Sequence, residues 1–148
     1  MRKIIHNNQR RAYMKENNTM QFGVHYMLDG YDANPELLAD KEKLQKILDT
    51  VPEDMKMYAI STPMVVEVGP NNEKDPGGLS GFVMIAESHI SFHTLPNRKF
   101  VTIDVYTCQN DLDTDKLTSL FIDAFGIKDY DVKVVKRGVR YPAEDIVS

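Results

Sequence analysis

A carboxylate, two hydroxyls and two imidazoles lie close together in the segment ESHISFH at residues 87–93. The apolar residues around them predict a strand, in which successive side chains point to opposite faces, so His89, Ser91 and His93 share one face. Hydroxyls and imidazoles are the usual agents of nucleophilic attack and proton transfer near neutral pH. This segment is therefore the first place to look for catalysis.

One thiol is expected to join this group through a hairpin. The residues PNRK at 96–99 predict a turn between two apolar stretches, 82–95 and 100–108. If the hairpin folds about residues 97 and 98, residues whose numbers sum to about 195 lie opposite each other. Cys108, the single cysteine of the chain, is then predicted to lie across from Glu87 and Ser88.

Three interpretations of this cluster follow from residue chemistry. A serine hydrolase would use Ser88 with a histidine base, but no Gly-x-Ser-x-Gly turn surrounds Ser88 and no acid is placed to orient a histidine. A metal site on His89 and His93 lacks an evident third ligand. In the third interpretation Cys108 and the histidines are ordinary core residues, which is less favoured because all of them occur together.

The elements that must position these residues follow from hydrophobic periodicity. Asn34 and Pro35 are a typical helix start, and Gly126 is a typical helix stop. The pattern predicts strands over 20–28, 56–68, 82–95, 100–108 and 130–135, an exposed loop over 69–78, and helices over 34–51 and 113–125. We expect an α/β protein of the α+β type, a two-layer sandwich in which two helices cover one face of a mostly antiparallel sheet of four to five strands.

Composition and charge narrow the class of protein. The chain has 148 residues, 42% of them hydrophobic, and a formal net charge of −4, and it contains no apolar run long enough to span a bilayer. We expect a basic, polar N-terminal extension over 1–19, a single domain over 20–148, and no binding to membranes or nucleic acid. One cysteine excludes an internal disulfide and favours a cytoplasmic location.

Several motifs together resemble one family. The segments GLSG at 78–81, ESHISFHT at 87–94 with Pro96 close behind, and DVYTC at 104–108 are similar in order and spacing to the prokaryotic S-adenosylmethionine decarboxylases. A weaker similarity includes GVH at 23–25 and KRG at 136–138, so the resemblance covers about residues 20–140. It implies an S-adenosylmethionine decarboxylase-like fold.

The resemblance implies a proenzyme that cleaves itself between Glu87 and Ser88. The Ser88 hydroxyl would attack the Glu87 carbonyl, and elimination and hydrolysis would convert Ser88 into a covalent pyruvoyl cofactor. By similarity, Ser80 binds the developing oxyanion, His93 removes the Ser88 α-proton, and Cys108 later protonates the α-carbon of the substrate. The pyruvoyl group then accepts the electrons that decarboxylation releases.

The resemblance also implies a pathway, polyamine biosynthesis, and a homodimer or larger assembly with active sites at the subunit interface. S-adenosylmethionine is the first expected substrate. Arginine or ornithine is an alternative substrate, because Leu95 and Asn97 replace the family's usual tryptophan and glutamate, and the loop 71–78 lacks the family's usual phenylalanine. The carboxylates of Glu67, Glu73 and Asp75 could bind the cationic side chain of such a substrate. A second alternative is an uncleaved regulatory subunit.

Overall fold

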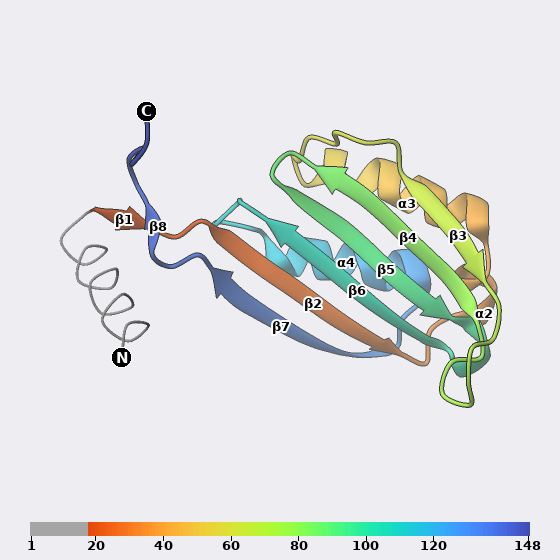
Figure 1. Ribbon diagram of the computed structural model, residues 1–148. Helices are drawn as coiled ribbons and strands as arrows, with labels where there is room; N and C mark the ends of the chain where they lie inside the picture. Colours follow the sequence, from red (N-terminus) through yellow and green to blue (C-terminus); the bar gives the residue numbers. More distant parts are fainter. Residues whose placement is uncertain (1–17) are drawn as a thin grey trace, which may run out of the picture.

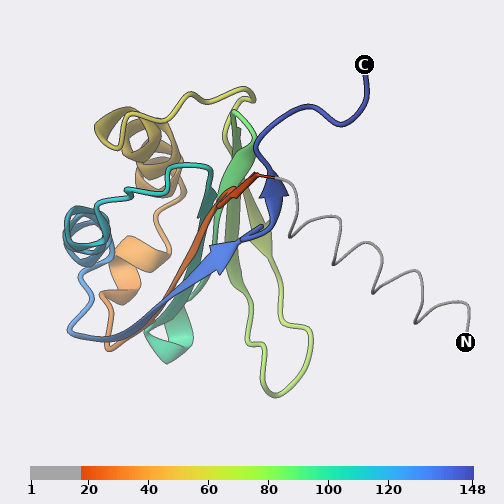
Figure 2. The same cartoon turned by 90° about the vertical axis from the view of Figure 1, so that its left-hand side faces the viewer.

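The computed structural model describes residues 18–148, and in this part of the chain one layer of helices lies against one antiparallel sheet. Figure 1 shows the sheet face-on, and Figure 2 shows it nearly edge-on with all helices on the same side. The α+β sandwich expected from the sequence is therefore confirmed. The basic extension predicted over 1–19 lies almost wholly outside the described residues, and none of the described helices has the length and apolarity needed to cross a bilayer.

The main sheet has six strands, more than the four to five expected. Every neighbouring pair is antiparallel. In sheet order the strands are β3 (Met64–Val68), β4 (Gly78–Ile85), β5 (Ser88–Leu95), β6 (Phe100–Thr107), β2 (Gly23–Tyr31) and β7 (Asp129–Arg137). Strand β2, far from both neighbours in the sequence, thus lies between β6 and β7, and this arrangement is plain in Figure 1.

The additional strand arises because the predicted strand over 82–95 is two strands. Ile85 pairs with Ser88, so Ala86 and Glu87 form a two-residue turn between β4 and β5. Neither turn residue is a glycine or asparagine, the residues that usually mark such turns, and the apolar pattern continues on both sides. The first half of the strand predicted over 56–68 is also irregular, because β3 begins only at Met64.

The long helix predicted over 34–51 is two helices, α2 (Pro35–Leu38) and α3 (Lys41–Asp54). The Asn34 side chain caps α2 as expected, but Asp40 provides a second N-cap by accepting a hydrogen bond from the Lys43 amide at 3.2 Å. A new cap within a helix restarts it. Pro52 was expected to follow the helix and instead lies in the last turns of α3, where its missing N–H removes a single hydrogen bond.

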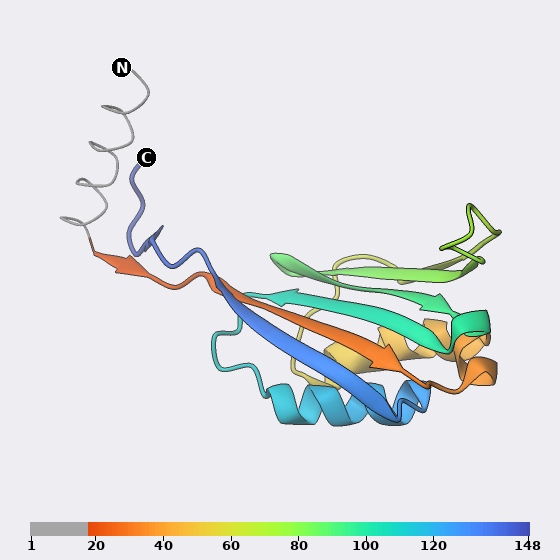
Figure 3. The same ribbon diagram turned by 90° about the horizontal axis from the view of Figure 1, so that it is seen from below.

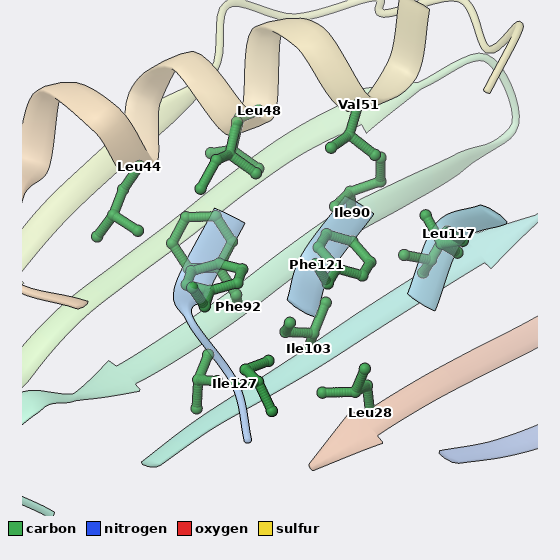
Figure 4. Packing of buried hydrophobic residues seen from close by; sticks show 14 of the residues in the cluster. Leu28, Leu44, Leu48, Val51, Ile90, Phe92, Ile103, Leu117, Phe121 and Ile127 are labelled. Atoms are coloured by element: carbon green, nitrogen blue, oxygen red, sulfur yellow. The ribbon is translucent and has the colours of Figure 1, made fainter. Parts of the chain in front are cut away.

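Helix α4 (Thr114–Phe125) agrees with the prediction at both ends. The Asp113 side chain caps its first turn, and Gly126 ends it with φ +61, a conformation that glycine adopts without strain. Helices α3 and α4 pack their apolar faces onto the sheet, and Figure 4 shows this contact. Its members include Leu28, Leu44, Leu48, Val51, Ile90, Phe92, Ile103, Leu117, Phe121 and Ile127.

Within residues 18–148 no helix lies on the opposite face of the sheet, and we call this face the open face. Because strand residues alternate, the open face is formed by the residues between the buried ones, among them His25, Ser80, His93, Asp104 and Tyr106. At one end a small pair of strands, β1 (Thr19–Met20) and β8 (Tyr141–Pro142), projects beyond the sheet, as Figure 3 shows. The η1 turn (Pro96–Arg98) closes the predicted β5–β6 hairpin.

Candidate active site

Ser80 and His93 form one half of the candidate site, on adjacent strands of the open face. The β4–β5 register pairs the two residues, and Ser80 Oγ lies 2.8 Å from His93 Nδ1. This hydrogen bond fixes the ring, and it depends on the turn at Ala86 and Glu87, which sets the register. The structure therefore brings together two residues that the sequence analysis placed in the site by resemblance alone.

The bond between Glu87 and Ser88 lies in a strained turn. Glu87 has φ +70, a left-handed conformation that costs an L-residue about 1–2 kcal/mol. Ala86 is not among the residues with positive φ, so only the second turn residue is left-handed, the pattern of a type II turn, which favours glycine at that position. A glutamate at this position stores strain beside the Ser88 nitrogen.

The Ser88 hydroxyl has an environment unlike that of the Ser80 hydroxyl. Ser88 Oγ is buried and has no hydrogen-bond partner within residues 18–148. A buried hydroxyl without a partner costs free energy, so in native proteins such a group calls for a specific explanation. Because this hydroxyl forms no hydrogen bond within residues 18–148, it is free to react with the neighbouring Glu87 carbonyl.

Cys108 lies next to this turn, as the hairpin analysis predicted. The β5–β6 register pairs His89 with Tyr106, and continuing it by two residues places Cys108 opposite Glu87. Burial raises the pKa of the Cys108 thiol, and the Glu87 carboxylate raises it further by accepting its hydrogen bond and by its negative charge. The thiol therefore remains protonated at neutral pH, as a proton donor must.

The two halves of the site lie at opposite ends of β5. His93 is five positions after Ser88 in this strand, which corresponds to about 17 Å of extended chain. Within one copy of the chain, the Ser80–His93 pair therefore does not reach the Glu87–Ser88 bond. The five predicted site residues form two groups instead of one.

Two of the alternative interpretations do not fit this geometry. His89 and His93 are four positions apart in one strand, about 13 Å, so they do not chelate a single ion. No group of three metal-ligating side chains lies within the described part of the chain. The serine–histidine pair that does form involves Ser80 and not Ser88, so Ser88 has no base of the hydrolase type beside it.

The structure adds residues that the sequence analysis did not select. Tyr106 lies on the open face between His89 and His25, with ring centroids 5.8 Å and 6.3 Å away. His25 Nε2 is 2.9 Å from Asp104 Oδ1, and the Arg137 guanidinium lies 4.7 Å from the centroid of the Tyr106 ring. The motifs GVH, DVYTC and KRG contain four of these residues, so the resemblance, including its weaker segments GVH and KRG, was the available signal.

Comparisons with known proteins agree with this description. A profile of the S-adenosylmethionine decarboxylase family matches residues 24–138. The S-adenosylmethionine decarboxylase proenzyme of Pyrococcus furiosus is 32% identical over 117 residues, 79% of each chain, and that of Thermodesulfovibrio yellowstonii is 32% identical over 79% of this chain and 82% of its own. The crystal structure of the adenosylmethionine decarboxylase from Aquifex aeolicus superimposes with a TM-score of 0.70 at 25% identity, covering 85% of this chain and 98% of that chain.

Fold, site and comparisons together define the class: the chain is a decarboxylase of the pyruvoyl-dependent type, a carbon–carbon lyase. It belongs to the S-adenosylmethionine decarboxylase family, since the family profile covers most of its length and prokaryotic members match it over four fifths of theirs.

Proposed function

We propose that this chain cleaves itself between Glu87 and Ser88 and that the product decarboxylates S-adenosylmethionine. The observation that carries the proposal is the Ser88 hydroxyl, buried and unpaired within residues 18–148, next to a left-handed Glu87 and opposite Cys108. The relatives reported above are S-adenosylmethionine decarboxylase proenzymes, and this similarity supports both the cleavage and the substrate.

In the cleavage reaction, Ser88 Oγ attacks the carbonyl carbon of Glu87 and the peptide C–N bond breaks, leaving an ester between the two residues. Removal of the Ser88 α-proton by His93 then expels the Glu87 carboxylate by β-elimination. Water converts the remaining enamine to a pyruvoyl group and releases ammonia. Ser80, hydrogen-bonded to the same histidine at 2.8 Å, is suited to stabilise the oxyanion of the first step.

In the proposed reaction a second copy of the chain supplies Ser80 and His93. Within one copy, His93 lies about 17 Å along β5 from Ser88, and Ser80 pairs with His93 from the adjacent strand β4. We propose a homodimer in which two open faces pack together with their strands reversed, so that each His93 end meets the other copy's Ser88 end. The open face supports this arrangement with exposed apolar side chains on two adjacent strands. They are Met64, Val66, Val68, Phe82 and Met84, which are 39–58% exposed.

The described residues fit a pyruvoyl group at position 88. Its carbonyl supplies an electron sink for the pair released when carbon dioxide leaves the substrate. Cys108, protonated because burial and Glu87 raise its pKa, is placed to deliver a proton to the substrate α-carbon. A reducing cytoplasm, the location we propose, keeps this thiol free.

Arginine or ornithine remains the second candidate substrate class, on one observation: the loop 71–77 presents no aromatic side chain for an adenine to stack on. The positions of Glu67 and Asp75 are less suited to binding a cationic substrate side chain. Glu67 alternates with the exposed residues Val66 and Val68 and shares the side of buried Val65, away from Ser80. The Asp75 carboxylate already accepts a hydrogen bond from the Gly77 amide at 3.1 Å.

One experiment tests the proposal in two stages. On a denaturing gel, the purified chain should give two bands whose masses match residues 1–87 and 88–148, and carbon dioxide should be released from carboxyl-labelled S-adenosylmethionine. Release from labelled arginine or ornithine alone would replace the substrate and keep the chemistry. A single intact band without carbon dioxide release would overturn the proposal and support an uncleaved regulatory subunit.

A further inference from the structure

Arg137 reaches across a neighbouring strand of the open face. It is the last residue of β7, and its guanidinium lies 4.7 Å from the centroid of the Tyr106 ring in β6. Strand β2 lies between β6 and β7, and Tyr106 is two positions along β6 from the level of Arg137, so the two backbones are about 12 Å apart. The side chain must therefore extend over β2 toward the strand that leads to Cys108.

Gly23 is the residue that allows this crossing. The register pairs Gly23 with Arg137 on one side, and the pairing of Val24 with Thr107 places Gly23 opposite Cys108 on the other. Gly23 has no side chain, and an added Cβ would collide with the Thr107 carbonyl oxygen. No side chain of β2 therefore separates the arginine from the thiol at this level of the sheet.

The stacked guanidinium is close to the proposed reaction centre and has no acidic partner there. Tyr106 precedes Cys108 by two positions on the same face, which corresponds to about 7 Å along the strand. The ion pairs within residues 18–148 are His25–Asp104, Lys43–Asp40 and Lys99–Asp32, and Arg137 takes part in none of them. A guanidinium that stacks by its face keeps its N–H edge available for a planar carboxylate.

We infer that Arg137 binds the α-carboxylate of the substrate. The inference rests on the proposed function: Cys108 protonates the α-carbon, and the carboxylate is bonded to that same atom, so the group that orients the carboxylate must lie within a few ångströms of Cys108. Bidentate contact with arginine suits a carboxylate, and the Tyr106 ring holds the guanidinium in place. The role applies to S-adenosylmethionine, arginine and ornithine alike, because all three carry this carboxylate.

The test compares Arg137→Met and Arg137→Lys with the control Lys133→Met, which removes one positive charge from the same face of β7. For each variant we would measure self-cleavage, kcat and KM for the substrate, and the inhibition constant of the product amine, which has lost the carboxylate. Arg137→Met should raise KM about 30-fold or more and leave cleavage and product inhibition unchanged. Arg137→Lys should raise KM by about tenfold, because it keeps the charge and loses the bidentate geometry.

Other outcomes are distinguishable from one another. A KM within threefold of wild type for both Arg137 variants would overturn the inference and leave the proposed function intact. An equal rise in KM and in the product inhibition constant would also overturn it, because Arg137 would then act by supporting Tyr106 and not by contact with the carboxylate. Wild-type chain that releases no carbon dioxide from any of the three substrates would overturn the proposed function, and this inference with it.

Discussion

Each end of β5 has a serine hydroxyl, and the two hydroxyls have different environments. At the His93 end, hydroxyl and imidazole are hydrogen-bonded at 2.8 Å and their strands are regular. At the Ser88 end, the hydroxyl is buried without a partner in the described chain, and the preceding residue is left-handed. The first arrangement is stable as it stands, whereas the second holds uncompensated free energy that a reaction at the Glu87–Ser88 bond would release.

Under the proposed function, this difference makes one copy of the chain half of a site. The end with stored strain would then supply the nucleophile and the proton donor, and the relaxed end would supply the base and the oxyanion donor. A reversed second copy would bring one of each together. The following experiments test the division between the two ends, beginning with the largest expected effect.

Replacing Ser88 with alanine should abolish both activities, because the nucleophile and the cofactor precursor are the same residue. The expected result is a single band on a denaturing gel and no carbon dioxide release. The matched control is Ser91→Ala, a serine of the same strand near its middle, which should cleave and decarboxylate normally. Cleavage of the Ser88→Ala chain would show that the reactive bond is not the one between Glu87 and Ser88.

Combining a Ser88→Ala chain with a His93→Ala chain in one dimer should restore the self-cleavage that each variant lacks by itself. Neither Ser88→Ala nor His93→Ala should cleave alone, but a mixed dimer contains one site with both native residues. Co-expression with different tags should therefore cleave up to about half of the His93→Ala chains and none of the Ser88→Ala chains, if the copies associate at random. If the His93→Ala chain cleaves by itself, or stays intact in the mixture, the site is not shared between copies.

Cys108→Ala should separate the two activities of the Ser88 end. Self-cleavage does not use the thiol and should proceed to two bands. Decarboxylation should slow by about 10²–10⁴-fold, the usual contribution of a positioned proton donor. The gel and the rate of carbon dioxide release from the same preparation measure both effects. A matching loss of cleavage would mean that Cys108 supports the structure of the turn at Glu87 and does not act as the proton donor to the substrate.

The Glu87 carboxylate should contribute to the alkaline limit of activity. Burial raises the pKa of the Cys108 thiol and the Glu87 carboxylate raises it further, so removing the Glu87 charge in Glu87→Gln lowers that pKa and the thiol loses its proton at a lower pH. The alkaline limb of the rate profile should therefore shift to lower pH, measured between about pH 7 and 10. Glu73→Gln, in the loop at the far end of the sheet, is the control, and an unchanged limb in Glu87→Gln would exclude this coupling.

The smallest effect concerns strain in the turn. In the uncleaved Ser88→Ala background, Glu87→Gly and Glu87→Ala both remove the side chain, but only glycine adopts φ +70 without cost. Glu87→Gly should exceed Glu87→Ala in free energy of unfolding by about 1 kcal/mol, measured by urea titration. At Ala86, where φ is not positive, the order should reverse, with Ala86→Gly less stable than the parent. Equal stability of the two Glu87 variants would mean that the turn holds no strain.

Much of the fold was predictable because its signals are local. The cap at Asp113 and the stop at Gly126 each bound α4 through a hydrogen bond to a residue three or four positions away along the chain. The β5–β6 register was also predictable, since a short turn at Pro96–Arg98 leaves few alternatives, and residues summing to 195 do pair. Local turn chemistry and strand alternation are sufficient for such features.

The errors have local causes as well. The turn at Ala86 and Glu87 carries no glycine or asparagine, so the sequence pattern continued through it and predicted one strand where there are two. The helix over 34–51 was predicted as unbroken because Asp40 resembles a surface residue of a helix until its side chain is seen to cap the Lys43 amide.

The sequence by itself supplied the candidates for the chemistry, since Ser88, Ser80, His93 and Cys108 were all named there from motif, spacing and the family resemblance. The tertiary structure decided how they are grouped. The extended conformation of β5 separated His93 from Ser88, and the position of β2 between β6 and β7 brought Arg137 over Tyr106 through the space left by Gly23. The second arrangement depends on pairings between residues far apart in the chain, which no local propensity specifies.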